Sequence, residues 1–438
     1  MKNISKEKLD LYRSLNIDTD SKYFRIHYRH GLLENIDKEF IKEVQTYYEK
    51  HYNQKIDPIT HIAYANLTNK KEVKILPQEF FRKKFLKVFN DSFMNDMYRD
   101  KGLYDTLFQT DQMVFNVIKC SRGHYYTRTN EYLDIDGATE ILLKDSDEYI
   151  IKPSDTNNGI GIEKIKIINN KMLLKDKPMV LKDIEKEYGY NFVIQRVLKQ
   201  HSVMATPHPQ SINTLRMATL RFNGKINNLY TFARFGQEGE IKDNANVGGL
   251  VVGVKANGEF MEHGVLKYKI VQQHPTTKMN IKDFGKIPNY GRILKFVREL
   301  HQDVLLQDYV AWDICISATG EPIFIEANFY GSSWVNQVAL EEPMLGEMTA
   351  DILKYIQKNE GKESVRNIES LAAKNNVKRR KLRRENQELN NEMKELQKMN
   401  KKLKTELEKK NGEIEHLNSE LETKKTSKSS ILNILKRK

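Results

Sequence analysis

Two short apolar segments joined by a turn predict a β-hairpin over residues 310–328, so the fold should contain an antiparallel sheet. Asp313 lies on the first strand, whereas Glu326 and Asn328 lie two residues apart on the second and share one face. The hairpin can therefore gather three oxygen-bearing side chains, which are the hard ligands that Mg²⁺ prefers. An ordinary strand pair with polar residues on its solvent-facing side is the alternative interpretation.

A second predicted strand, residues 148–153, carries Lys152 near its end and leads into a polar loop over residues 154–161. Gly159 and Gly161 lie in this loop, and glycine tolerates the left-handed conformations that turn backbone N–H groups toward a phosphate. The segment does not contain the Gly-Lys-Ser/Thr sequence of a Walker loop. It predicts either a cover over phosphate groups or a plain hairpin turn.

Two arginines lie inside predicted strands, where core packing does not explain them. Arg216 belongs to residues 211–221 and Arg234 to residues 230–236, and Asn244 follows in a polar loop. Guanidinium groups bind phosphate and carboxylate bidentately, so these residues predict an anionic ligand. A solvated sheet face is the alternative.

The first hundred residues do not show the strand-like alternation found later in the chain. Apolar residues at helical spacing around Phe40 and Phe80 predict two amphipathic helices. Asp37 is the expected N-cap of the first helix, and Pro77 precedes the second. The sequence therefore predicts an N-terminal helical domain.

A heptad pattern in the C-terminal part of the chain predicts a coiled coil over residues 366–422. Leucines recur at multiples of seven from Leu382 along one seam, and Asn386 and Asn400 interrupt the apolar residues of the other seam. Buried asparagines favour a parallel two-stranded coil, so a homodimer is expected. A single solvated helix is the alternative.

The positive charge of the chain is concentrated in the same part. Residues 366–438 hold 21 lysines and arginines against 11 acidic residues, which leaves +10 of the net charge of +13. The weak charge of the remainder and the short basic stretch before the leucines predict no nucleic-acid partner. Residues 423–438 predict a basic amphipathic tail that would lie on an anionic membrane surface or on a partner such as a glycosyltransferase, or would fray.

Cysteine content and hydropathy predict the compartment. Cys120 and Cys315 are the two cysteines of the chain, and Cys315 lies in an apolar strand, so both are expected to be reduced thiols. No stretch approaches the roughly 20 apolar residues of a membrane-spanning helix, and the N-terminal residues contain no apolar signal region. We therefore expect a cytoplasmic protein, with the inner face of the membrane as an additional location.

Taken in order along residues 95–355, these segments resemble the ATP-grasp superfamily, in particular its branch associated with sugar transfer and surface polysaccharides. The resemblance implies an α/β (α+β) fold with an ATP-grasp catalytic domain. The motifs that carry it are Lys152-Pro153, Ser211-Ile212-Asn213-Thr214-Leu215-Arg216, Ala233-Arg234-Phe235-Gly236, Asp243-Asn244, Gly248-Gly249, His274-Pro275, Ile287-Pro288, Trp312-Asp313 and Glu326-Ala327-Asn328.

The resemblance also implies a role for each motif residue. Lys101 and Lys152 would contact the phosphates of ATP, with Lys119 as the rival of Lys101, and the loop with Gly159 and Gly161 would cover them. The catalytic residues Arg216, Arg234 and Asn244 would stabilise the transferring phosphoryl group. The hinge residues Gln195, Arg196 and Val197 would bind adenine. The ligands of Mg²⁺ would be Asp313, Glu326 and Asn328.

The implied activity is an ATP- and Mg²⁺-dependent carboxylate–amine ligase that acts through an acyl-phosphate in surface-polysaccharide or cell-envelope biosynthesis. Its substrates would be a small-molecule or glycan carboxylate and an amine. A kinase that stops at phosphoryl transfer and a nucleotide-binding scaffold of a polysaccharide assembly complex are the alternatives. The expected domains are residues 1–100, helical; 101–358, ATP-grasp, with a nucleotide-covering subdomain at 145–198 and the metal-site sheet at 205–357; 366–422, coiled coil; and 423–438, tail.

Overall fold

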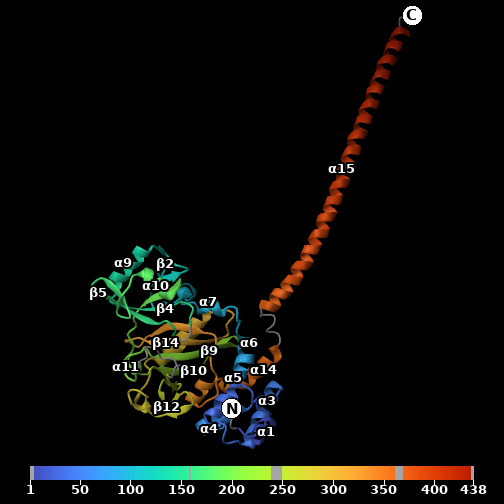
Figure 1. The fold of residues 1–438 in the computed structure, drawn as a ribbon. Coiled ribbons are helices and arrows are strands. Elements are labelled where there is room, and N and C mark those ends of the chain that lie inside the picture. The colour runs from blue at the N-terminus through green and yellow to red at the C-terminus, as the bar shows by residue number, and fades with distance from the viewer. Residues whose placement is uncertain (1–3, 157–158, 238–248, 361–367, 436–438) are drawn as a thin grey trace. The chain divides into compact units, whose positions relative to one another are not determined.

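The computed structural model describes the chain except for residues 1–3, 157–158, 238–248, 361–367 and 436–438. The chain divides into two compact units, Met1–Asn367 and Ile368–Lys438 (Figure 1). The first unit mixes helices with two β-sheets, and the second is a single long helix. The predicted mixed fold class and the long C-terminal helix are therefore confirmed.

Short helices fill the N-terminal part of the first unit. Asp37 caps helix α3 as predicted, because its side chain accepts hydrogen bonds from the backbone N–H groups of Glu39 and Phe40. Pro77 precedes a helical run that contains one π-helical turn. The elements are α1 (Lys6–Ser14), α2 (Lys22–Arg29), α3 (Lys38–Tyr52), α4 (Ile59–Thr68), α5 (Gln78–Phe80), η1 (Phe81–Phe85), α6 (Leu86–Phe89), α7 (Asn95–Arg99), η2 (Lys101–Leu103) and α8 (Tyr104–Leu107).

The smaller subdomain is an antiparallel sheet of eight strands in the order β3-β2-β1-β8-β4-β5-β6-β7. Helices α9 and α10 pack on it through a core that includes Leu142, Ile151 and Ile184. The elements are β1 (Asn116–Ser121), β2 (His124–Tyr126), β3 (Tyr132–Leu133), α9 (Ile135–Asp145), β4 (Glu148–Pro153), β5 (Glu163–Ile168), β6 (Lys171–Leu174), β7 (Lys177–Pro178), α10 (Leu181–Tyr188) and β8 (Asn191–Arg196).

The larger sheet has seven antiparallel strands in the order β13-β12-β11-β10-β9-β14-β15. Its elements are α11 (Ser202–Ala205), β9 (Thr214–Phe222), β10 (Lys225–Phe235), β11 (Leu250–Val254), β12 (Phe260–Leu266), β13 (Lys269–Val271), η4 (Ile281–Asp283), α12 (Tyr290–Leu300), η5 (His301–Asp303), β14 (Tyr309–Ile316), β15 (Pro322–Asn328), α13 (Trp334–Leu340), η6 (Gly346–Met348) and α14 (Thr349–Asn359). Strands β14 and β15 form the predicted hairpin, with Asp313 opposite Glu326.

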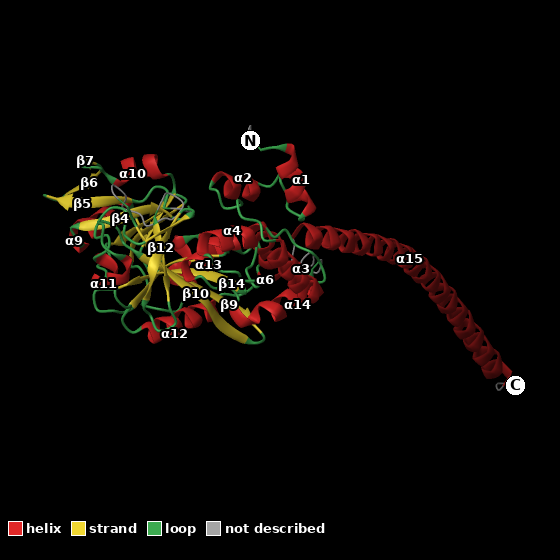
Figure 2. Cartoon of the chain, turned by 90° about the horizontal axis from the view of Figure 1, so that it is seen from below, coloured by secondary structure: helices red, strands yellow, loops and turns green. Residues whose placement is uncertain are grey.

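Both faces of the larger sheet are buried, because side chains alternate between two hydrophobic cores. Ala218 and Leu220 of β9 pack into a core shared with the N-terminal helices, α13 and α14, whereas Leu215 and Met217 pack toward α12. Helices α4 and α13 accordingly lie across the sheet from α12 (Figure 2). The N-terminal helices thus share a core with the sheet, while the predicted domain boundaries remain predictions.

The second unit contains helix α15 (Ile368–Leu435). Its large apolar side chains are exposed along the helix, from 50% for Leu382 to 62% for Leu403 and Leu407. In the part of the chain that the structure describes, no helix is both long and apolar enough to cross a membrane. Cys120 and Cys315 are buried free thiols.

Candidate functional site

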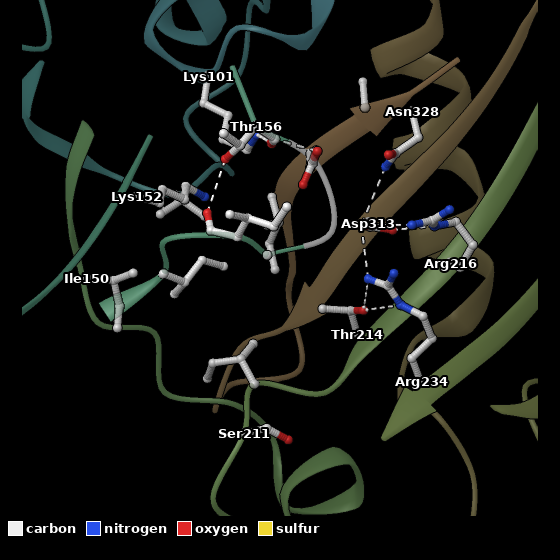
Figure 3. Close-up of a pocket in the computed structure, with 18 of the residues that line it drawn as sticks. Lys101, Ile150, Lys152, Thr156, Ser211, Thr214, Arg216, Arg234, Asp313 and Asn328 are labelled. Atoms are coloured by element: carbon white, nitrogen blue, oxygen red, sulfur yellow. Dashed lines mark hydrogen bonds and ion pairs between the residues drawn. The ribbon is translucent and has the colours of Figure 1, made fainter. Parts of the chain in front are cut away.

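A cavity of about 680 Å³ is lined by residues of both sheets, a size typical of small-molecule sites. In the view of Figure 3, Lys101 and Lys152 lie on one side of the cavity, and Asp313 lies on the other with Arg216, Arg234 and Asn328. Among the described residues, all predicted site residues except Gly161 line this cavity. They are Lys101, Lys152, Gly159, Gln195, Arg196, Val197, Arg216, Arg234, Asp313, Glu326 and Asn328.

Asp313 is the centre of a buried charge cluster on the larger sheet. Strand β14 lies between β9 and β15, which places Asp313 directly opposite Arg216 on one side and Glu326 on the other. Both Nε and Nη2 of Arg216 donate to the carboxylate, and Arg234 Nη2 lies 2.9 Å from Asp313 Oδ2. Burial alone would raise the pKa of Asp313, but the two guanidinium groups outweigh it and lower the pKa below its ordinary value. The carboxylate is therefore held ionised.

Glu326 and Asn328 complete the predicted metal-binding set. Lys101 Nζ lies 3.5 Å from Glu326 Oε1, and Asn328 Nδ2 lies 3.5 Å from Asp313 Oδ2. Two carboxylates and an amide oxygen on one hairpin are hard donors that fit Mg²⁺, which binds through one or two carboxylates while phosphates and water complete its octahedron. The described residues thus fit the ion, although their metal-binding role remains a prediction.

The two predicted nucleotide lysines are both buried. Lys101 Nζ donates to the carbonyl oxygen of Thr156 at 2.8 Å, and this hydrogen bond links η2 to the loop after β4. Lys152 is 6% exposed, and burial, reinforced by the neighbouring Lys101 charge, lowers its pKa to about 7. The rival Lys119 donates to Arg128 and Asn130 and is outside the cavity lining.

The predicted hinge includes the last two residues of strand β8 and the residue after it. Gln195 Nε2 donates to Asn116 Oδ1 at 2.7 Å, and Arg196 stacks on the Phe115 ring, with 4.2 Å between guanidinium carbon and ring centroid. The side chain of Arg196 also pairs with Asp145. These side chains are engaged within the protein, and the backbone N–H of Arg196 donates to the carbonyl oxygen of Phe115 at 3.1 Å. Adenine binding by the hinge remains a prediction.

The predicted phosphate-covering loop has two glycines with positive φ, Gly159 at 66° and Gly161 at 74°. A Cβ at Gly161 would lie 2.8 Å from Cδ of Pro153, so only glycine fits there without movement. Gly161 supports the loop from outside the cavity lining, whereas Gly159 lines the cavity. Asn244 lies outside the described residues, so its predicted role remains untested.

The cavity also contains residues that the sequence analysis missed. Thr214 accepts hydrogen bonds from Nε and Nη2 of Arg234, at 3.1 and 2.7 Å, and thereby orients that guanidinium. Arg82, Asn95 and Arg99 line the cavity from the N-terminal helices. Two of these residues had a sequence signal, since Thr214 lies in the motif of residues 211–216 and Arg99 lies two residues before Lys101.

Three solved ligase structures match parts of the chain at low sequence identity and low TM-score. An L-amino acid ligase from Bacillus licheniformis matches at 13% identity and TM-score 0.33, over 59% of this chain and 48% of that one. A D-Ala:D-Ser ligase from Enterococcus faecalis matches at 12% and 0.37, over 62% and 64%. A D-alanyl-alanine synthetase A from Vibrio cholerae matches at 13% and 0.34, over 61% and 66%. The chain thus spans less than two thirds of each of these proteins.

Sequence comparison gives the family directly. No curated protein sequence matches the chain. The model of the family described as sugar-transfer associated ATP-grasp matches residues 80–352, which include every predicted site residue. The matched region comprises more than half of the chain, and it contains both sheets and the cavity between them. The chain therefore belongs to the sugar-transfer associated ATP-grasp family.

Proposed function

We propose that the protein is an ATP- and Mg²⁺-dependent carboxylate–amine ligase that acts through an acyl-phosphate. The observation that carries this proposal is the convergence of two lysines, two arginines and three oxygen-bearing side chains on one cavity. Phosphoryl transfer depends on positioning and charge neutralisation more than on covalent help from the protein, and this set of side chains suits that task.

In the proposed reaction, a substrate carboxylate oxygen attacks the γ-phosphorus of ATP and ADP leaves. An amine then attacks the acyl carbon, loses a proton and expels inorganic phosphate, which leaves an amide. Lys101 and Lys152 would bind the phosphates, and Arg216 and Arg234 would stabilise the negative charge of the transferring group. Mg²⁺, when bound by Asp313, Glu326 and Asn328, would supply further charge neutralisation to the triphosphate.

The biological setting is proposed from the family description alone. Its association with sugar transfer supports a role in surface-polysaccharide or cell-envelope biosynthesis. The substrates would then be a sugar acid or other glycan carboxylate and an amine such as an amino acid or amino sugar.

The test is ADP release by the full chain with ATP, Mg²⁺ and pooled sugar acids and amines. ADP together with an amide product, identified by its mass, supports ligation. ADP with a stable phosphorylated product would replace the ligase by a kinase, and nucleotide binding without turnover would favour the scaffold. Failure to bind nucleotide at all would contradict every version of the proposal.

Lys152 predicts that nucleotide binding depends on pH. Its pKa of about 7 in the free protein should rise when the triphosphate binds beside it, so the complex holds a proton that the free protein lacks. Affinity should therefore be greatest below pH 7 and fall by at most about tenfold per unit as the pH rises toward the pKa of the complex. Calorimetry at pH 8 in buffers of different ionisation enthalpy should detect proton uptake.

Two variants make this measurement specific. Lys152→Arg should abolish the proton uptake, because arginine stays protonated in proteins. Lys166→Arg is the matched control, since Lys166 lies on the same sheet with an exposed side chain that pairs with Asp176. Equal proton uptake in wild type and Lys152→Arg would contradict the assignment.

We further propose that the protein is a homodimer joined through α15. The leucines at 382, 389, 396 and 403 repeat every seven residues, and all are exposed on the isolated helix. A partner helix would bury this apolar seam, and Asn386 and Asn400 on the adjacent seam favour two parallel strands.

The basic tail is proposed to contact an anionic membrane surface or a partner protein. Its side chains beyond residue 425 lie outside the described ones.

Charge at the seam should dissociate the dimer. Leu396→Glu combined with Leu403→Glu removes two seam leucines from each chain and should weaken dimerisation at least a hundredfold, or about 3 kcal/mol. Lys398→Glu on the opposite helix face is the control and should stay dimeric. Light scattering measures the mass of each variant and of a chain that lacks residues 366–438, which should be monomeric. An unchanged dimer after that deletion would exclude the coil as the interface.

A further inference from the structure

We propose that Arg82 and Arg99 form an anion-binding subsite in the same cavity, and that one of the two substrates carries a second negatively charged group, a carboxylate or a phosphate, held there. This inference rests on the proposed ligase function, because it concerns what lies beside the nucleotide. It adds a substrate class that the family description does not supply.

Both arginines come from the N-terminal helices and line the cavity together with Asn95, Tyr330 and Asn328. Arg99 ends α7, directly before the η2 turn that carries Lys101. Asn95 Nδ2, at the other end of α7, donates to the Tyr330 hydroxyl at 2.5 Å, and Tyr330 lies two residues after Asn328. The subsite therefore adjoins the strand with the predicted metal ligands.

Hydrogen bonds join the loop after β15 to the helical run that contains Arg82. Asn90 Nδ2 donates to the carbonyl oxygen of Phe329 at 3.1 Å, and Gln78 Oε1 accepts from Ser332 Oγ at 2.8 Å and from the Ser333 backbone N–H at 2.7 Å. These buried hydrogen bonds hold Arg82, Arg99 and the metal-site strand in one frame. A ligand bound by the arginines would therefore be held at a constant distance from the predicted phosphate and metal site.

The ion pairs of the helical run show that Arg82 is placed differently from its neighbours. Lys83 pairs with Glu79, and Lys84 pairs with Glu360. Arg82 has no ion-pair partner among the residues that the structure describes, and it faces the cavity from the π-helical turn Phe81–Phe85. Interruptions of this kind in helices are frequent at functional sites.

The charges of the cavity also favour a second anion. Among the described residues, its lining has eight basic side chains and two carboxylates: Arg82, Arg99, Lys101, Lys152, Lys164, Arg196, Arg216 and Arg234 against Asp313 and Glu326. Six of these eight basic side chains belong to η2 or to the two sheets, which also carry the predicted nucleotide and metal sites. Arg82 and Arg99 lie on the N-terminal side of the cavity. Among the described residues, Arg99 pairs with the exposed Asp96, at 3.2 Å. Guanidinium groups match the geometry of carboxylate and phosphate oxygens.

Inorganic phosphate and acetate serve as the two probes, titrated separately into the full chain with and without Mg²⁺ and a non-hydrolysable ATP analogue. Binding in the millimolar range is expected with the nucleotide present. Arg82→Gln and Arg99→Gln should each weaken it about tenfold or more, because each removes a charged hydrogen-bond donor. The affinity for the ATP analogue should change less than twofold in either variant. Preference for phosphate or acetate distinguishes the two substrate chemistries.

Arg29→Gln, an equal change of charge at an exposed position on α2 outside the cavity lining, is the matched control. The subsite is refuted if Arg29→Gln weakens anion binding as much as the cavity variants, if those variants bind both anions as wild type does, or if wild type binds neither anion. If wild type fails to bind the ATP analogue, the proposed function is contradicted instead. In that case, comparing anion binding by wild type and by the two cavity variants without nucleotide tests the subsite separately.

Discussion

Glu326→Gln is expected to abolish ATP-dependent turnover while leaving the protein folded. The substitution keeps the shape of the side chain but removes one of the two carboxylates that would hold Mg²⁺ against the triphosphate. Metal-based charge neutralisation supplies several kcal/mol in such reactions, so ADP release should fall by about a thousandfold. Among the described residues, Glu326 forms one ion pair, with the buried Lys101 at 3.5 Å, and its own side chain is 17% exposed. Because one longer ion pair is lost, the melting temperature should fall, but by less than in the Asp313→Asn variant, which loses pairs with two arginines.

Glu321→Gln is the matched control for this experiment. Glu321 lies at the turn of the same hairpin and pairs with Arg292 on the surface, outside the cavity lining. Its loss should leave the rate of ADP release within about twofold of wild type, as expected for an exposed ion pair. A Glu326→Gln enzyme that releases ADP at the wild-type rate, at every Mg²⁺ concentration, would remove Glu326 from the proposed metal site.

Asp313→Asn is expected to be inactive and also destabilised, which separates it from Glu326→Gln. Asp313 is almost fully buried and neutralises two arginines whose side chains are only 17% and 12% exposed. Removing the carboxylate takes the buried ion pair with Asp313 away from both guanidinium groups, a change that costs about 3–5 kcal/mol when the pair is buried. Denaturant unfolding monitored by circular dichroism measures this loss for unit Met1–Asn367.

A second substitution shows which of the two effects is structural. Arg216→Met in the Asp313→Asn background removes one of the two guanidinium groups that lose their ion pair with Asp313 and should restore a large part of the lost unfolding free energy. It should not restore ADP release, because the metal-binding carboxylate is still absent. If Asp313→Asn were as stable as wild type, the ion pairs of Asp313 would not stabilise the fold. The substitution would then affect activity alone.

Local sequence patterns were sufficient to predict the elements that carry the site. The turn at residues 319–322 between two short apolar segments predicted the β14–β15 hairpin, and the strand that ends near Lys152 was also predicted. The Asp37 cap and the helix after Pro77 were predicted as well, since capping and periodicity depend on neighbouring residues. The π-helical turn over Phe81–Phe85 was missed, because no short-range signal distinguishes it from an ordinary helical turn.

The partners of the predicted residues could not be predicted, because they come from strands far apart in the chain. Arg216 lies 97 residues before Asp313, and only the order of strands in the larger sheet makes them neighbours. The resemblance implied that Arg216 acts on the phosphoryl group and Asp313 binds the metal, whereas the structure pairs the two directly. The substitutions described above test the predicted roles.

By itself, the sequence determined the mixed fold class, the family, the long C-terminal helix and eleven of the residues that line the cavity. These depend on local periodicity and on ordered motifs. Only the tertiary structure decided that Lys152 is buried enough for its pKa to fall to about 7, and that Arg82 and Arg99 reach the same cavity from the N-terminal helices. Burial and charge pairing depend on which segments pack together, and a residue's neighbours in the chain do not contain that information.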